Sequence, residues 1–314
     1  MAAPAPKTAI APIAARDLTR DTDLSAAEFR QLLALAEQVK RSPSRFSGAL
    51  SGQYLSLLFE KPSLRTRMTF ELAIKQLGGD CVVSTGPIAV REPVKDVARN
   101  LERWTGGIVA RTFSQETIDE LARWAGVPVV NALSDRYHPC QALADLFTIE
   151  ERFGRLHGLK LAFIGDGNNV AHSLMLQCAM TGMDFAIATP PGYAPNAEIV
   201  SEARALASAT GSHLHLTHDP AEAAAGAHGV YTDVWASMGQ ERPAEQLAQD
   251  FRGYQVNEAL MSVARPEAVF LHCLPARRGQ EVTDAVMESR ASVVFDQAEN
   301  RLHVQKALLL MLLS

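Results

Sequence analysis

The chain has 314 residues, of which 47% are hydrophobic and 21% are charged, and its formal net charge is −5. These values are typical of a soluble globular protein of about two domains, and they argue against a nucleic-acid-binding protein that relies on a broad basic surface. The longest apolar run near the end of the sequence, residues 307–313, is far too short to cross a bilayer, which requires about 20 residues.

The start of the chain does not resemble a secretory signal. Residues 1–16 are rich in alanine and proline, and the prolines interrupt any apolar core region. We therefore expect a flexible leader over residues 1–16 and a cytoplasmic protein. The four cysteines form no CxxC pair, so the sequence predicts neither a zinc knuckle nor a thioredoxin-type site.

Helical and strand patterns then alternate along the chain. A capping-box sequence at Ser25–Glu28 precedes apolar residues at helical spacing, which predicts the first helix. A buried strand is predicted at residues 54–59, followed by a helix at residues 63–77 that two glycines terminate. Further short apolar runs predict strands near residues 107–110, 127–130, 159–164, 185–189, 213–216, 229–232, 268–271 and 293–295.

This alternation determines the expected fold class. Strands that alternate with helices form parallel sheets with helices on both faces. We therefore predict an α/β protein with two doubly wound parallel-sheet domains joined by interdomain helices, one of which begins near His138. The domains are expected at residues 1–148 and 149–297, and residues 298–314 are expected to form a helix that packs back on the body of the protein.

The junction between the strand at 54–59 and the next helix has the residues of an anion site. A helix N-terminus offers unpaired N–H groups and the positive end of the helix dipole. Ser63 and Thr66 add hydroxyl groups, Arg65 adds a planar fork that matches a phosphoryl group, and Lys61 adds a point charge. In the alternative interpretation, Ser63 only caps the helix and the arginines are solvated.

Two further segments in the first half have comparable chemistry. Arg111 ends a predicted strand, and His138 opens the next helix with Pro139 at its first position. Gln141 lies three residues after His138 and therefore on the same face of that turn. A histidine can donate to a carbonyl oxygen as negative charge builds on it. Each of these residues alone is more often structural than catalytic.

In the second half, residues 165–169 form a glycine-rich turn between a predicted strand and helix. Val170 stands where a dinucleotide fingerprint has its third glycine, which disfavours a dinucleotide-dependent oxidoreductase. The three histidines at positions 213, 215 and 218 are interpreted as surface residues rather than a metal site. Asp233 and Cys273 each follow a predicted strand; Asp233 can neutralise and orient an amine, whereas the bland alternative for Cys273 is a buried inert thiol.

Taken together, residues 63–67 and 138–141 resemble the carbamoyl-phosphate signature of the aspartate/ornithine carbamoyltransferase family, and the resemblance extends over residues 18–313. It implies that residues 1–148 bind carbamoyl phosphate and residues 149–297 bind ornithine. The implied carbamoyl-phosphate ligands are Ser63, Leu64 through its backbone, Arg65, Thr66, Arg111, His138, Gln141 and Arg301.

Residues 233–241 resemble the ornithine-binding loop of this family, and residues 272–275 resemble the loop that faces the distal amine. The implied ornithine ligands are Asn169, Asp233, Ser237, Met238, Cys273 and Leu274. The resemblance implies transfer of the carbamoyl group from carbamoyl phosphate to the δ-amine of L-ornithine, which gives L-citrulline and phosphate. This reaction belongs to arginine metabolism, and the sequence leaves open whether it serves arginine biosynthesis or catabolism. We expect no metal or organic cofactor.

The implied chemistry assigns roles to four residues. A free alkylamine has a pKa of about 10.4, so its proton must be removed before attack. We expect Asp233 and Cys273 to position the amine and help remove this proton. Arg65 and His138 are expected to stabilise the oxyanion that attack creates, and closure around both substrates is expected to exclude water.

The resemblance also implies a homotrimer or a multiple of trimers. Two positions depart from the family pattern: Leu64 stands where threonine is frequent, and Pro87 stands where a neighbouring subunit often supplies a donor to the phosphate. Three alternatives remain open. The acceptor could be putrescine or an N-acylated ornithine, the chain could be a catalytically silent paralogue, or it could be the disfavoured oxidoreductase.

Overall fold

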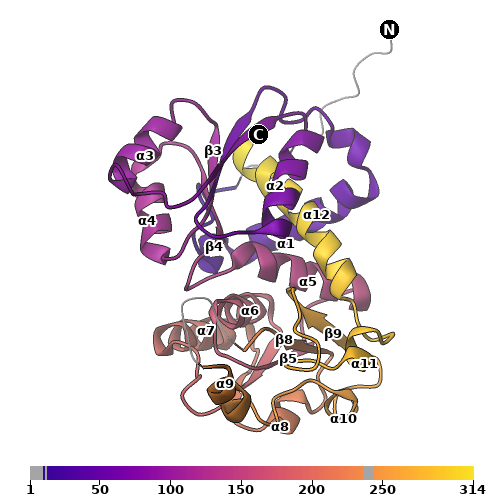
Figure 1. Ribbon diagram of the computed structural model, residues 1–314. Helices are drawn as coiled ribbons and strands as arrows, with labels where there is room; N and C mark the ends of the chain where they lie inside the picture. The colour runs from indigo at the N-terminus through magenta and orange to yellow at the C-terminus, as the bar shows by residue number, and fades with distance from the viewer. Residues whose placement is uncertain (1–9, 11–12, 236–242) are drawn as a thin grey trace. The chain divides into compact units, whose positions relative to one another are not determined.

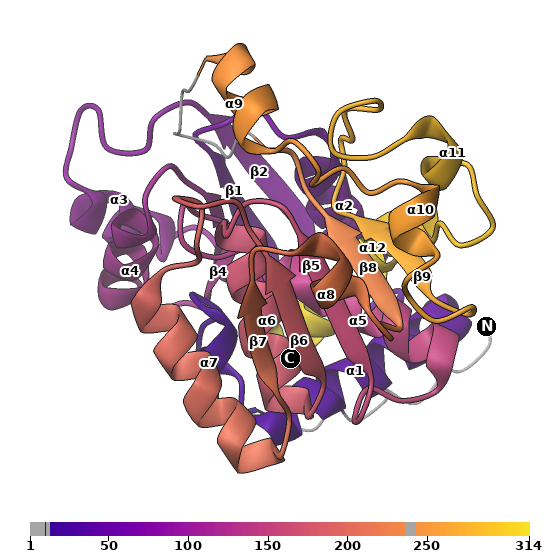
Figure 2. The ribbon, with the colours of Figure 1, turned by 90° about the horizontal axis from the view of Figure 1, so that it is seen from below.

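The computed structural model describes residue 10 and residues 13–235 and 243–314. Contacts divide the chain into two compact units, Met1–Leu143 with Glu299–Ser314, and Ala144–Ala298. Each unit contains one sheet of parallel strands with helices beside it (Figures 1 and 2). The predicted class, α/β with two parallel-sheet domains, is therefore confirmed.

The first unit contains a four-stranded sheet in the order β2-β1-β3-β4. Phe59 pairs with both Thr85 and Arg111, so the carboxyl ends of three neighbouring strands lie level with one another. This edge of a parallel sheet is where α/β proteins place ligands. The strands are β1 (Tyr54–Phe59), β2 (Asp80–Thr85), β3 (Gly107–Arg111) and β4 (Val129–Leu133).

Helices cover both faces of this sheet, with α3 and α4 on one face and α1 and α2 on the other (Figure 1). The capping box predicted at Ser25 and Glu28 is present at the start of α1. The boundaries between the two units fall within α5 and α12. The helices are α1 (Ala26–Arg41), α2 (Leu64–Gln76), α3 (Val94–Leu101), α4 (Gln115–Trp124), α5 (Pro139–Phe153) and α12 (Val294–Leu313), with 3-10 turns at Asp21–Asp23 and Pro43–Phe46.

An N-terminal segment extends this sheet beyond β4. Leu18 forms an isolated parallel bridge with Val130. The Leu18 N–H donates to the carbonyl of Val129, and the Asn131 N–H donates to the carbonyl of Leu18. The outer edge of β4 is thus paired, whereas β2 forms the opposite edge of the sheet.

The second unit contains a five-stranded sheet in the order β7-β6-β5-β8-β9 (Figure 2). Thr232 pairs with Ile164 on one side and with His272 on the other, so the segments after β5, β8 and β9 leave the sheet at the same edge. The strands are β5 (Lys160–Ile164), β6 (Asp184–Ala188), β7 (Leu214–Thr217), β8 (Gly229–Thr232) and β9 (Val269–His272).

Helices α6 and α7 lie on one face of this sheet, and α8, α9 and α10 lie on the other (Figure 1). The second face buries an apolar cluster that includes Ile164, Val230, Phe251 and Phe270. The helices are α6 (Asn169–Thr181), α7 (Ala197–Thr210), α8 (Pro220–Ala224), α9 (Ala244–Asp250), α10 (Glu258–Met261) and α11 (Asp284–Met287).

Two local predictions were wrong. Residues 293–295 were expected to form a strand, but α12 begins at Val294, and only Ser292 bridges to Phe270. A short apolar run does not distinguish a strand from the start of a buried helix. Strand β2 was not predicted at all, because its residues are mostly exposed and form no apolar run. Within the described ranges, no helix combines the length and apolarity that a membrane crossing requires.

Candidate active site

The start of α2 provides the first part of the site. Ser63 occupies the N-cap position with extended backbone angles, but its side chain makes no capping hydrogen bond. The first turn of the helix carries no acidic residue, so its positive dipole end is not neutralised there. Leu64 is 71% exposed and Thr66 is buried. The geometry therefore suits an anion held by backbone N–H groups and the Ser63 hydroxyl.

Behind this helix start, polar residues form what we call the anion cradle: Thr66, Arg111, His138, Gln141 and Arg301. Arg111 is partly exposed, and the other four are buried. Arg301 donates from one guanidinium nitrogen to Thr66 Oγ1 at 2.7 Å and from the other to Gln141 Oε1 at 2.8 Å. Arg111 reaches the same Thr66 hydroxyl at 3.5 Å, the outer limit of a hydrogen bond. Residues far apart in the sequence thus converge on Thr66.

His138 lies among three arginines. Burial, together with the charges of Arg301, Arg111 and Arg65, holds the pKa of His138 well below its usual value. The imidazole is therefore neutral at neutral pH and can donate one N–H to a ligand oxygen. Concentrated positive charge in a poorly solvated place favours a ligand with negative charge.

The second unit positions a different set of groups, which we call the carboxylate–thiol cluster: Asn168, Asp233 and Cys273. Asp233 follows β8 and is buried. Its Oδ2 accepts from Asn168 Nδ2 at 2.9 Å, and its Oδ1 accepts from Cys273 Sγ at 3.0 Å. The Val234 N–H also donates to Oδ1 at 2.8 Å. Both carboxylate oxygens are therefore held in fixed directions, as a group that orients an amine requires.

The loop that carries Cys273 is fixed by a buried histidine. His272 Nδ1 accepts from the Leu274 N–H at 2.9 Å, and His272 Nε2 donates to Glu281 Oε1 at 3.1 Å. His272 and Glu281 have no exposed surface. Leu274 has a φ of 60° and precedes a cis peptide bond to Pro275. A non-glycine residue in this backbone region persists only where its surroundings hold it, as His272 does here.

A second buried network anchors the start of the same loop. The His272 N–H donates to Gln297 Oε1 at 3.0 Å. Gln297 Nε2 in turn donates to Asp145 Oδ1 at 2.6 Å and to the Tyr231 hydroxyl at 3.2 Å. Buried networks whose members are hydrogen-bonded rigidify their surroundings, so the position of Cys273 depends on Gln297, Asp145 and Tyr231, which have no exposed surface.

Asp233, His272 and Cys273 lie close enough together to be considered as a metal site, but their hydrogen bonds do not suit one. In the described part of the chain, Asp233, His272 and Cys273 bring three potential ligand atoms within 4.8 Å of one another. Both ring nitrogens of His272 are already used in hydrogen bonds to Leu274 and Glu281. Only one carboxylate and one thiol would remain, which is fewer than the three or four protein ligands of a zinc site.

The glycine-rich turn after β5 has a structural explanation. A side chain at Gly167 would collide with the backbone of Ala194 and Pro195, since its Cβ would lie 2.3 Å from the Pro195 nitrogen. The Gly167 N–H donates to the carbonyl of Tyr193 at 2.8 Å. This glycine accommodates the chain itself rather than a pyrophosphate, so the oxidoreductase alternative has no support at this turn.

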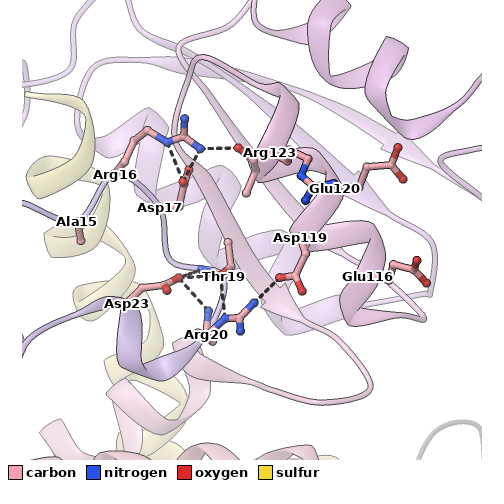
Figure 3. Close-up of a pocket in the computed structure, with 11 residues that line it drawn as sticks. Ala15, Arg16, Asp17, Thr19, Arg20, Asp23, Glu116, Asp119, Glu120 and Arg123 are labelled. Carbon is pink, nitrogen blue, oxygen red and sulfur yellow. Dashed lines mark hydrogen bonds and ion pairs between the residues drawn. The ribbon is translucent and has the colours of Figure 1, made fainter.

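Cavities also occur away from these residues. A surface cavity of about 630 Å³ lies between the N-terminal segment and α4 (Figure 3). Two of its three arginines form ion pairs with carboxylates: Arg16 pairs with Asp17, and Arg20 pairs with Asp119, both at 2.7 Å. It shares no lining residue with the anion cradle or the carboxylate–thiol cluster. Its size therefore does not make it the candidate active site.

The predicted site residues thus form two groups. Thr66, Arg111, Gln141 and Arg301 are joined by hydrogen bonds in the first unit, with His138 and Arg65 beside them. In the second unit Asp233 and Cys273 are in contact, Leu274 follows directly, and Asn169 is the first residue of α6. Ser237 and Met238 lie outside the described residues. Asn168, Glu281 and Gln297 were not predicted from the sequence. The only sequence feature that could have pointed to them is that they are polar residues inside or after the recognised segments.

Comparison with known proteins agrees with this division. Residues 16–151 match the family model described as the carbamoyl-P binding domain of aspartate/ornithine carbamoyltransferase, and residues 157–312 match its Asp/Orn binding domain. The ornithine carbamoyltransferase of Gloeobacter violaceus is 51% identical over 93% of this chain and 94% of its own length. That of Thermus thermophilus is 52% identical over 95% and 97%.

A solved structure gives the same result for the fold. The structure of ornithine carbamoyltransferase from Pyrococcus furiosus matches with a TM-score of 0.94 and 44% identity, covering 97% of this chain and 99% of that one. With both family domains matched and the predicted signatures brought together in each unit, this chain belongs to the aspartate/ornithine carbamoyltransferase family.

Proposed function

We propose that this chain transfers the carbamoyl group of carbamoyl phosphate to the δ-amine of L-ornithine, producing L-citrulline and phosphate. The observation that carries the proposal is the pair Asp233–Cys273, a carboxylate in contact with a thiol at 3.0 Å, in a chain whose other unit gathers three arginines around the buried His138. A carboxylate and a thiol suit a cationic amine that must lose a proton, and the arginines suit a phosphoryl dianion.

In the proposed reaction, the neutral δ-nitrogen attacks the carbonyl carbon, and the bond from that carbon to the phosphate oxygen breaks. Arg65, His138 and Thr66 stabilise the oxyanion, while Arg65 and Arg111 offset the charge of the leaving phosphate. Asp233 and Cys273 orient the amine and help remove its proton, which phosphate finally accepts. Further proposed ligands of carbamoyl phosphate are Ser63, Leu64, Gln141 and Arg301, and those of ornithine are Asn169, Ser237, Met238 and Leu274.

The test is formation of the carbamoylated product from carbamoyl phosphate with four amines in parallel: L-ornithine, which gives citrulline, and putrescine, N-acetyl-L-ornithine and L-aspartate. We expect kcat/KM for ornithine to exceed that for the others by at least about 100-fold, because a site built to hydrogen-bond a group rejects analogues that lack it. Comparable turnover of putrescine or N-acetylornithine would replace the proposed acceptor, and no product with any amine would refute transferase activity.

We also propose that the enzyme is a homotrimer or a multiple of trimers. Leu64, Met68 and Leu72 recur every four residues on α2 and are 71%, 53% and 41% exposed. The edge strand β2 adds Val82, which is 65% exposed. An apolar helix stripe together with an exposed sheet edge favours burial against a second copy of the chain.

Light scattering tests this assembly. We expect a mass of three times 34.0 kDa, or a multiple of that value. The double variant Met68→Glu/Val82→Glu should dissociate, whereas Val263→Glu, which changes an equally apolar exposed residue of the second unit, should not. A monomeric or dimeric wild-type protein would contradict the proposal.

Two broader assignments follow from the proposed reaction. Its product carries the carbamoyl group that a route from ornithine to arginine needs, so we propose a role in arginine biosynthesis. The four cysteines are free thiols in the structure, which supports a reducing compartment, and we propose the cytoplasm.

A further inference from the structure

Glu60 is the first residue after β1, and its carboxylate connects two loops that leave the same edge of the sheet. Its Oε1 accepts from the Ile88 N–H at 3.1 Å, in the loop after β2. Its Oε2 accepts from the Phe113 N–H at 2.9 Å, in the loop after β3. One side chain therefore joins three segments whose strands end level with one another.

The same residue also holds Arg111 through the backbone. The Glu60 N–H donates to the carbonyl oxygen of Arg111 at 3.0 Å. The short segment from Arg111 to Phe113 is thus hydrogen-bonded to Glu60 at both of its ends. Because the Arg111 guanidinium reaches Thr66 in the anion cradle, the direction of this arginine depends on how its segment leaves β3.

A cation beside the anion cradle depends on the same contact. The ammonium group of Lys61 lies 4.1 Å from the centre of the Phe113 ring, a cation–π arrangement. The Lys61 side chain is largely buried, although Phe113 itself is 56% exposed. Fixing the Phe113 backbone therefore also fixes the surface on which Lys61 rests. Lys61 and Ser63 both line a cavity of about 520 Å³ at this edge of the sheet.

We propose that Glu60 is a positioning residue for the phosphate end of the substrate: it holds Arg111 and the platform of Lys61 in the geometry that binds the anion. The inference rests on the proposed function for the identity of the substrate. An ionised carboxylate is the group that fits here, because both contacts are N–H donors from separate loops. An amide offers one accepting oxygen and turns its NH2 toward the other donor.

The variant Glu60→Gln tests this role. The amide oxygen can accept from only one of the two N–H groups, those of Ile88 and Phe113. The amide NH2 then faces the other N–H, and that hydrogen bond is lost. We expect the KM for carbamoyl phosphate and the Kd for inorganic phosphate to rise roughly tenfold, as loss of a hydrogen bond to a charged group implies. The KM for ornithine should stay unchanged, and kcat should stay within about threefold, since Glu60 touches no reacting atom.

A second readout follows the loops themselves. In hydrogen exchange, the amides of residues 86–90 and 112–114 should exchange faster in Glu60→Gln, while those of the β1 strand should not. If Glu60→Gln does not fold, Glu60→Asp carries the test, because it keeps the charge but shortens the reach to both loops. Unchanged phosphate affinity together with unchanged exchange in the two loops would overturn the proposal.

Glu28→Gln is the matched control. Glu28 is also a carboxylate that accepts backbone N–H groups from separate segments, those of Ala14 at 2.7 Å and Ser25 at 2.9 Å. It makes none of its hydrogen bonds to the anion cradle. Its loss should lower stability without changing phosphate affinity. Phosphate binding also distinguishes failure of the Glu60 proposal from failure of the proposed function. The affinity for phosphate can be lower in Glu60→Gln than in the wild type even if the wild-type protein carbamoylates no amine.

Discussion

The anion cradle and the carboxylate–thiol cluster are built in opposite ways. Three of the five cradle residues belong to helices: Thr66 to α2, Gln141 to α5 and Arg301 to α12. The other two are Arg111, which ends β3, and His138, which directly precedes α5. The carboxylate–thiol cluster lies on the segments that follow β5, β8 and β9. Asn168 donates a hydrogen bond to Asp233, and His272 supports the loop that carries Cys273.

This difference follows from the charges of the two proposed substrates. A phosphoryl dianion keeps its charge, so its site can be a fixed set of cations whose mutual repulsion the ligand relieves. An amine must arrive as a cation and react as a neutral group, so its site needs one acceptor of defined direction and neighbours that can share a proton. Substitutions in one site should therefore leave ligand binding at the other site unchanged.

The largest effect is expected for Arg65→Ala. Arg65 lies close enough to His138 to help lower its pKa, together with Arg301 and Arg111. Removing it should lower kcat/KM for carbamoyl phosphate about 10³-fold, because in the proposed reaction it binds the phosphate and stabilises the developing oxyanion. The affinity for ornithine analogues should change much less. Citrulline formation within a few-fold of wild type would exclude this role.

Asp233→Asn should disable the carboxylate–thiol cluster, with a smaller loss of kcat/KM than Arg65→Ala causes. The amide preserves the shape but removes the charge that opposes the cationic amine. We expect kcat/KM for ornithine to fall about 10²-fold, with phosphate binding unchanged by calorimetry. If phosphate affinity fell in parallel, the two sites would not be separable and the comparison would fail.

Cys273→Ala should have a moderate effect. The substitution removes the hydrogen bond from Sγ to Asp233 Oδ1 but leaves the Asn168 contact. We expect kcat/KM for ornithine to fall about tenfold, the cost of one hydrogen bond to a charged group, and the pH profile of kcat to change shape. An unchanged rate and profile would remove Cys273 from the mechanism. Cys273→Ser, which retains a donor, serves as the control.

The smallest expected effect is on the pH dependence of the unfolding free energy. It is caused by His138 of the anion cradle and involves no residue of the carboxylate–thiol cluster. The pKa of His138 in the folded protein lies well below 6.5. Above pH 6.5 the residue is neutral in both states and contributes no pH dependence. Below pH 6.5 the unfolded chain takes up a proton that the folded protein does not, so stability falls by at most about 1.4 kcal/mol per pH unit.

Thermal unfolding between pH 7 and pH 5 measures this dependence. His138→Asn should flatten the curve in that window, and adding phosphate to the wild-type protein should flatten it as well, because a bound anion favours the protonated imidazole. A His138→Asn curve parallel to that of the wild type would mean that other groups cause the acid dependence.

The sequence was sufficient for elements that carry a strong local pattern. β1 and β8 were predicted with the observed bounds because they are continuous apolar runs between polar segments. β2 was not, because an exposed edge strand needs no apolar run. The resemblance supplied every residue of the anion cradle and two of the carboxylate–thiol cluster, Asp233 and Cys273, but Asn168 and the supporting residues depend on tertiary structure. Asn168 lies 65 positions from Asp233, and Gln297 lies 152 positions from Asp145.

The bridge between Leu18 and Val130 has a practical consequence for work with this protein. A sheet edge with free N–H and C=O groups can pair with another molecule and nucleate aggregation. Here residues near the amino terminus occupy one edge of the first sheet. Shortening the chain past Leu18 would uncover β4 and should yield insoluble protein, whereas an affinity tag fused ahead of residue 13 should leave this pairing undisturbed.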